Sequence, residues 1–124
     1  MPGGKTKGTL IRLFSGKEED LNRLILLVLR SSKQPLAKYD VYLQIHGMKG
    51  SRHVTSKTIY RRMGDLICEG WIAQNGTRPG KVQGESILYE LTQKGIAALK
   101  VDKIEQFLLT ATEEKLRKLN DVLP

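Results

Sequence analysis

The sequence predicts an α+β fold that is mostly helical, with a small antiparallel sheet of two or three strands and a C-terminal helix. Two observations lead to this prediction. Apolar residues recur at three- and four-residue steps in several segments, which is typical of helices that bury one face. Two short runs, WIAQ and SILYELT, are rich in apolar, β-branched and aromatic residues and are separated by glycines and a proline, as in a β-hairpin.

Length and composition limit the classes to which the chain can belong. Its 124 residues suit one domain, because domains cluster near about 100 to 150 residues. No apolar run approaches the roughly 20 residues that span a bilayer, and the N-terminus lacks the apolar segment of a signal peptide. The single cysteine, Cys68, excludes an internal disulfide and a cysteine-rich zinc site. We therefore expect a cytoplasmic protein without a membrane partner.

The net charge of +8 is concentrated in two segments. Residues 1–17 contain four Lys or Arg and no acidic residue, and residues 49–81 contain seven against two. Each phosphate that a protein neutralises releases condensed counterions, which is a physical reason to gather cations. A general solubility device would not be so local, so the distribution indicates a nucleic-acid footprint.

The N-terminal segment, residues 1–15, is predicted to be a flexible basic arm, because its Gly-rich composition is unsuited to folding alone. We expect Lys5, Lys7 and Arg12 to follow phosphates and to add non-specific affinity.

The first helix is predicted to run from about Gly16 to Arg30. Ser15 and Glu18 form a capping box, in which the two side chains satisfy free backbone amides at a helix start. The interior, LNRLILLVLR, is apolar around most of its circumference, which predicts a central helix with neighbours on several sides.

The second helix is predicted at Lys38–His46, after Pro35 has ended the first and allowed a short extended piece at Leu36. The loop that follows, HGMKGSRH, is rich in hydrogen-bond donors through Lys49, Arg52 and His53.

The third helix has one apolar and one basic face. Thr55 or Ser56 can cap its start, and Gly70 suits its end. Like charges four residues apart repel slightly, so cations without interleaved acids favour a polyanionic partner. The apolar stripe consists of Ile59, Met63, Leu66 and Ile67, and the opposite face of Lys57, Thr58, Arg61 and Arg62.

The hairpin is predicted to have a long irregular tip, NGTRPGKVQGE, which carries Arg78 and Lys81. Thr92 caps the following helix, and residues 93–123 form either one bent helix or two, with Glu113 and Glu114 suited to a first turn after Thr112.

The C-terminal segment, residues 101–124, is predicted to dimerise. Its apolar stripe is larger than the remaining inner surface of a small domain can cover, and exposed stripes of this kind mark interfaces. The alternative is that the terminal helix folds back onto the first helix of its own chain. The expected interface residues are Val101, Ile104, Phe107, Leu108, Leu116 and Leu119.

The order of elements, two helices, a basic helix, a hairpin with a basic tip and a further helix, is that of a winged helix-turn-helix over residues 16–100. TIYRRMGDLICEGWI, followed by a Gly-rich stretch and LYELTQKGIAAL, resembles the winged-helix transcriptional regulators, and EGWI with YELTQKG is most similar to their PadR-like branch. YDVYLQI resembles the second helix of that branch, although Lys38 stands where a Gly usually precedes Tyr39.

The resemblance implies that the third helix enters the major groove of double-stranded DNA, with the wing on the backbone or minor groove. Arg61 is the best candidate for bidentate contact with guanine. Tyr60 either packs in the core or donates its hydroxyl to a phosphate. The predicted DNA-binding set is Ser56, Lys57, Thr58, Tyr60, Arg61, Arg62, Lys49, Arg52, His53, Arg78 and Lys81.

No enzyme, cofactor or metal is expected. His46 and His53 are seven residues apart without a carboxylate or thiol at ligand spacing, and no catalytic set or P-loop is present. The alternatives to a DNA-binding regulator are a winged-helix protein-interaction module and an RNA-binding winged helix. With no separate ligand domain predicted, an effector would have to bind at a subunit interface.

Overall fold

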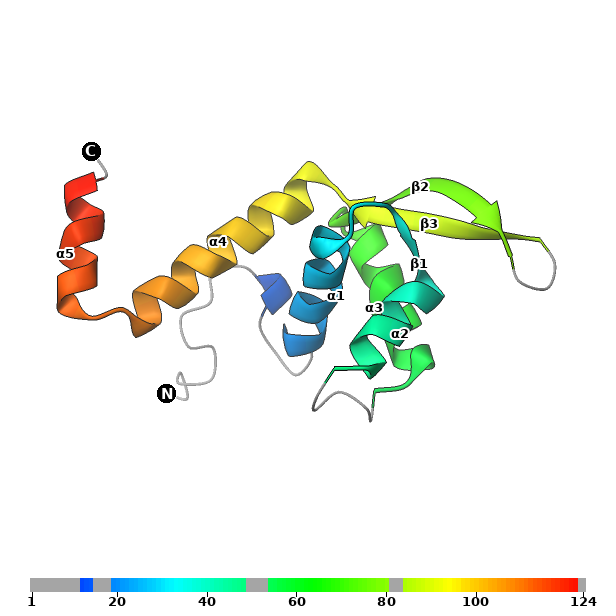
Figure 1. Ribbon diagram of the computed structural model, residues 1–124, viewed down its shortest axis with the longest axis horizontal. Helices are drawn as coiled ribbons and strands as arrows, with labels where there is room; N and C mark the ends of the chain where they lie inside the picture. The colour runs from blue at the N-terminus through cyan, green and yellow to red at the C-terminus, as the bar shows by residue number, and fades with distance from the viewer. Residues whose placement is uncertain (1–11, 15–18, 49–53, 81–83, 123–124) are drawn as a thin grey trace.

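The computed structural model describes residues 12–14, 19–48, 54–80 and 84–122 (Figure 1). Most of these residues are helical, and they include a small antiparallel sheet, so the predicted fold class is confirmed. After a 3₁₀ turn at Arg12–Phe14, the elements are α1 Glu19–Ser31, β1 Leu36–Ala37, α2 Lys38–His46, α3 Ser56–Cys68, β2 Ile72–Pro79, β3 Glu85–Leu91, α4 Gln93–Thr110 and α5 Glu113–Val122.

The sheet has three strands in the order β1-β3-β2, and all neighbours are antiparallel. The predicted extended piece after Pro35 is β1, whose Leu36 lies opposite Tyr89 and whose Ala37 lies opposite Leu88. This short strand joins the start of α2 to the central strand, so the hairpin is attached to the helical body at its base.

The hairpin of β2 and β3 is longer than predicted, and the prediction of an irregular tip from Asn75 onward was wrong. The ladder continues from Gln74, opposite Tyr89, to Thr77, opposite Ile87, through an irregularity that absorbs one extra residue on β2. Gly76 lies there with φ +89°, a conformation that glycine adopts without strain. Pro79 is tolerated because it ends an edge strand.

The core lies between the helices and the inner face of the sheet. Helix α1 contacts α2, α3, α4 and β3, as expected for a helix that is apolar on several sides. Burying each large aliphatic side chain contributes roughly 1.5 to 3 kcal/mol, so these contacts hold the three helices together. The fully buried large side chains are Phe14, Ile25, Leu26, Val41, Ile45, Ile59, Met63, Leu66 and Ile72.

The boundary of the predicted N-terminal arm differs from the structure. Leu13 and Phe14 are buried in the core, and the Asn22 amide donates to the Leu13 carbonyl at 2.8 Å. The 3₁₀ turn at Arg12–Phe14 therefore belongs to the folded domain, because the apolar side chains of Leu13 and Phe14 pack into the core beside α1. The predicted capping box and the rest of the arm lie outside the described residues.

The C-terminal region forms two helices rather than one bent helix. Thr92 caps α4 as predicted, accepting from the Gly95 amide at 3.0 Å. Ala111 leaves the helical region, and the Thr112 hydroxyl accepts from the Lys115 amide to begin α5. Helix α4 runs without interruption across the predicted domain boundary at residue 100, and it carries α5 away from the body (Figure 1).

Candidate nucleic-acid interface

Helix α3 is positioned by its caps and by a fully buried apolar face. The Thr55 hydroxyl accepts from the Thr58 amide at 3.2 Å, and Gly70 turns the chain after the last residue with φ +87°. Ile59, Met63 and Leu66 have no exposed surface. The helix is therefore anchored along one side, and its other side is directed outward.

The outward side of α3 carries the predicted cations Lys57 and Arg61, both of which are exposed. Ser56 and Thr58 are half-buried beside them, and the Thr58 hydroxyl is hydrogen-bonded to that of Thr55 at 3.1 Å. The first turn contains no acidic residue. This face presents a positive surface on a rigid helix, which suits an anionic groove or backbone.

Arg62 differs from its neighbour Arg61. Its side chain is 15% exposed, and its Nε donates to Asn22 Oδ1 at 3.0 Å while its Nη1 donates to Asp65 Oδ2 at 2.7 Å. The guanidinium is thus directed along the α1–α3 junction, where it satisfies a buried amide oxygen. This geometry makes Arg62 a residue that positions α3.

Tyr60 lines a cavity of about 320 Å³ between the start of α2, α3 and the wing strand β3. Burial raises the pKa of its hydroxyl, and Tyr39, Tyr42 and Asp40 add to the shift. The hydroxyl stays protonated at neutral pH and remains a donor. The other residues that line the cavity are Ala37, Lys38, Tyr39, Glu85, Ser86, Ile87 and Tyr89.

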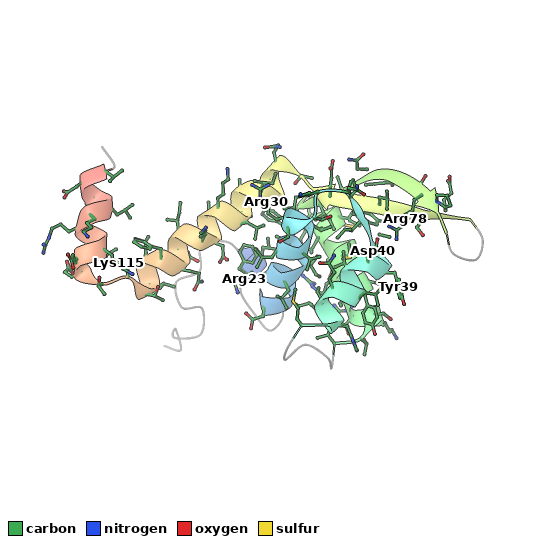
Figure 2. All side chains as sticks on the ribbon, viewed as in Figure 1. Arg23, Arg30, Tyr39, Asp40, Arg78 and Lys115 are labelled. Carbon is green, nitrogen blue, oxygen red and sulfur yellow. The ribbon has the colours of Figure 1, made fainter. Side chains whose placement is uncertain are left out.

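The wing is tied to α2 by an ion pair. Arg78 lies in β2 opposite Ser86, and its Nη2 is 2.8 Å from the Asp40 carboxylate (Figure 2). Asp40 also accepts from the Ala37 amide at 3.0 Å, so one carboxylate caps α2 and holds the wing. Arg78 was predicted at an irregular tip, whereas the structure places it in the ladder with its guanidinium directed toward α2.

The remaining predicted contacts in the loop before α3 and at the wing tip lie outside the described residues. They are Lys49, Arg52, His53 and Lys81.

The predicted dimer stripe is exposed along α4, while acidic residues on the same helix are buried. Ile104 and Leu108 are 57% and 51% exposed, whereas Asp102 and Glu105 are buried, Asp102 against Arg23 of α1. Val101 and Phe107 are also exposed, and α5 has no buried residue. The alternative in which the terminal helix folds back onto α1 is therefore not observed. Leu116 and Leu119 are half-buried.

Three polar residues that organise this region were absent from the predicted site. Asn22 and Arg23 on α1 bond to α3 and α4, and Asp40 holds the wing. The sequence does contain a signal for α4, since Asp102 and Glu105 interrupt an apolar segment at a three-residue spacing.

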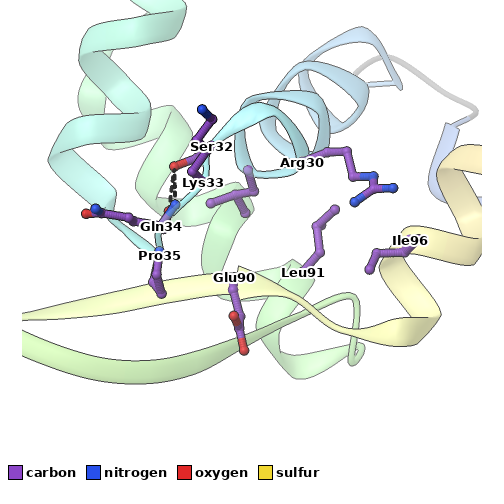
Figure 3. Close-up of a pocket in the computed structure, with 9 residues that line it drawn as sticks. Arg30, Ser32, Lys33, Gln34, Pro35, Glu90, Leu91 and Ile96 are labelled. Carbon is purple, nitrogen blue, oxygen red and sulfur yellow. Dashed lines mark hydrogen bonds between the residues drawn. The ribbon is translucent and has the colours of Figure 1, made fainter.

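A second cavity, of about 150 Å³, lies between the end of α1, β3 and the start of α4 (Figure 3). Arg30, Lys33 and Glu90 contribute charged groups to its rim. It is smaller than the roughly 300 Å³ at which pockets for drug-sized ligands begin.

Other residues singled out in the sequence have structural surroundings. The Trp71 indole donates to Glu69 Oε1 at 2.9 Å, and the Lys94 ammonium lies 4.2 Å from its ring centre. Cys68 is exposed. Among the described residues no group of His, Cys, Asp and Glu could hold a metal ion, and no helix is long and apolar enough to cross a membrane.

The arrangement of three helices followed by a β-hairpin wing, with β1 between α1 and α2, decides the architecture. The chain has the winged helix-turn-helix fold. No family model matches the sequence of this winged helix, and no curated protein matches it. Solved structures that this chain matches confirm the resemblance to PadR-like proteins at the level of the fold.

Three of these structures show the extent of the likeness. A Streptococcus transcriptional regulator matches the winged helix with a TM-score of 0.60 at 17% identity, covering 82% of this chain and 92% of its own. A PadR-like transcriptional regulator from Bacillus cereus matches with a TM-score of 0.59 at 18% identity, covering 80% and 93%. Bacillus subtilis PadR, solved in complex with operator DNA, matches with a TM-score of 0.57 at 23% identity, covering 86% of this chain and 60% of its own.

Proposed function

We propose that this chain is a homodimeric, sequence-specific DNA-binding transcriptional regulator, in which α3 enters the major groove and the wing contacts the backbone or minor groove. The fold supports the proposal, because similar structures belong to transcriptional regulators and one of them is bound to operator DNA. An α-helix fits the major groove, where each base pair presents a distinct pattern of donors and acceptors.

The observation that carries the proposal is the division of α3 into a fully buried face and an exposed cationic face. Ile59, Met63 and Leu66 are fully buried and hold the helix, while Lys57 and Arg61 are exposed on the other side. Arg61 is proposed to read a guanine through two parallel hydrogen bonds. Arg62 is proposed to act through its contacts with Asn22 and Asp65, by holding the face in position.

The surroundings of α3 supply further donors for phosphates. Tyr60 and Lys38 lie on the cavity between α2, α3 and the wing, where a hydroxyl and an ammonium can approach one strand of the backbone. Arg78 is proposed to contribute positive charge from the wing while it remains paired with Asp40. Lys49, Arg52, His53 and Lys81 remain proposed contacts from their positions in the sequence.

Dimerisation is proposed through α4 and α5, because the second half of α4 buries Asp102 and Glu105 and leaves large apolar side chains such as Ile104 and Leu108 exposed. A second copy is the partner that this arrangement suits, since one stripe can meet the same stripe across a two-fold axis. Such a dimer would place two copies of α3 about 34 Å apart, one turn of DNA, so that each reads a half-site.

In-vitro selection from a randomised duplex library, followed by competition with RNA, tests this proposal. We expect a palindromic consensus whose duplex outcompetes RNA of the same sequence at fixed salt. A set of selected sequences without a shared motif would contradict sequence-specific recognition. Equal or tighter binding to RNA would favour the RNA-binding alternative.

A further inference from the structure

Two consecutive residues of α1 connect the proposed recognition helix to the proposed dimerisation helix. Asn22 accepts from the Arg62 guanidinium of α3 at 3.0 Å. Arg23, the next residue, donates to both carboxylate oxygens of Asp102 on α4, from Nε at 2.8 Å and from Nη2 at 3.0 Å. Helix α1 therefore makes polar contacts with both the proposed recognition helix and the proposed dimerisation helix.

The contact with α4 is a partly buried and directional ion pair. The Asp102 side chain is 7% exposed and that of Arg23 is 21% exposed. Two parallel hydrogen bonds between a guanidinium and a carboxylate fix orientation as well as distance. The guanidinium also lies 5.0 Å from the centre of the Phe14 ring, which holds it from the other side. These contacts restrict how α4 can tilt or roll against the body.

The direction of α4 affects the position of the dimer partner, because a small tilt of a long helix displaces its far end by several ångströms. Its 18 residues span about 27 Å at about 1.5 Å per residue, so a tilt of about 10° displaces its end by about 5 Å, more than the roughly 3.4 Å between base pairs. Beyond Asp102, α4 exposes Ile104 and Leu108, whereas Glu105 is buried.

We infer that Arg23 and Asp102 are positioning residues that set the separation of the two recognition helices in the dimer, and therefore the half-site spacing that the dimer accepts. The inference rests on the proposed function, because it requires a dimer formed through α4. In this proposal the Arg23–Asp102 contact, which lies away from the DNA-facing surface, determines the spacing between half-sites. Helix α3 determines which bases are recognised.

The single cysteine allows a direct measurement of this separation. Cys68 is exposed at the end of α3, so a nitroxide attached to it places one spin label on each recognition helix. Double electron–electron resonance on the full-length protein without DNA then reports the distance between the two helices. The wild type is expected to give one narrow distance distribution.

Asp102→Asn is expected to broaden or shift this distribution, because a neutral amide cannot replace the bidentate ion pair. Asp20→Asn is the matched control, since Asp20 contacts the same guanidinium at 3.2 Å but lies on α1 itself and is almost fully exposed. Arg23→Lys serves as a second variant if Asp102→Asn does not fold, because lysine keeps the charge and loses the fork.

A distribution that is unchanged in Asp102→Asn and in Arg23→Lys would overturn the inference and leave the proposed function intact. A wild-type protein without dipolar coupling would be a monomer, and it would overturn both.

The selected half-sites provide a second measurement, in duplexes whose spacing changes one base pair at a time. The preference for the best spacing over its neighbours is expected to fall about five- to tenfold in Asp102→Asn, since a looser connection spreads the effective concentration of the second site. Affinity for an isolated half-site is expected to stay unchanged. An equal loss of affinity at every spacing would contradict the positioning role.

Discussion

At the scale of single residues, the two adjacent arginines of α3 have different surroundings and therefore different proposed roles. Arg61 is exposed on the cationic face, and Arg62 is held between Asn22 and Asp65. A residue that contacts bases affects recognition, whereas a residue that satisfies a buried group affects stability. Substituting Arg61 and Arg62 separately therefore compares an effect on recognition with an effect on stability within one turn of α3.

Arg61→Ala is expected to relax base preference at one position of the consensus and to cost about 1 to 3 kcal/mol of binding free energy, as for a lost bidentate contact. Lys81→Ala, in the segment that joins β2 to β3, is expected to weaken binding to all sequences similarly and to flatten the salt dependence. Titrations with consensus and single-mismatch duplexes at several salt concentrations measure both effects. If Arg61→Ala alters neither affinity nor preference, α3 is not the reading helix.

Arg62→Ala is expected to lower the free energy of unfolding by roughly 1 to 3 kcal/mol, because it leaves the oxygen of the buried Asn22 amide without its donor. Urea unfolding at one fixed protomer concentration measures the loss, and the selected consensus should not change. Arg61→Ala is the control and is expected to leave stability nearly unaltered. A changed consensus with wild-type stability would show that Arg62 reads bases.

At the scale of elements, the start of α4 depends on close contact with the segment that leads into β2. Thr92 caps the helix and also donates its hydroxyl to the Gly70 and Trp71 carbonyls at 2.7 and 3.1 Å. Gly95 follows one turn later, and a Cβ atom there would lie 2.2 Å from the Trp71 carbonyl oxygen. Gly95 is thus required because the backbone of α4 lies too close to the backbone at Trp71 to leave room for a side chain.

Gly95→Ala is expected to destabilise the fold by about 1 to 3 kcal/mol or more, because backbone must move to admit the methyl group. Gly64→Ala is the matched control in another helix, where an added Cβ meets nothing within 4 Å. That substitution should stabilise α3 by about 0.5 to 1 kcal/mol, as alanine does in a helix interior. Chemical denaturation of both variants tests the pair, and similar stabilities would contradict this packing.

At the scale of the whole molecule, the outward projection of α4 and α5 gives the chain an extended form (Figure 1). The exposed apolar stripe lies on the projecting part, away from the cationic face of α3. Binding of a second copy and binding of DNA could therefore take place on different surfaces, as the proposed dimeric regulator requires.

Replacing Ile104 and Leu108 with Asp is expected to give soluble monomers that keep their helical content and bind a palindromic site far more weakly. Both side chains are more than half exposed, so their replacement removes little of the domain's own core. Lys103→Asp, on an exposed neighbouring position, is the control for added negative charge. Sedimentation measures the oligomeric state, and circular dichroism measures the helical content. A wild-type protein that sediments as a monomer at micromolar concentration, with and without DNA, would contradict the dimer proposal.

Local chemistry was sufficient to predict the elements and most of their ends. Thr55 and Thr92 cap α3 and α4 as expected, Pro35 separates α1 from β1, and α2 has the predicted bounds. These features depend on residues within one or two turns of each other, so a short stretch of sequence contains their causes. The length of β2 was not predicted, because the bulge at Gly76 is stabilised by pairing with β3.

The surroundings of the polar side chains depended on contacts between distant parts of the chain. Asn22, which accepts from Arg62, is 40 residues away from it, and Arg23, which pairs with Asp102, is 79 residues away. A helical pattern places Arg61 and Arg62 on the same broad face, but only packing against α1 separates them. For the same reason Asp102 of α4 faces inward, because the partly buried guanidinium of Arg23 on α1 lies opposite it.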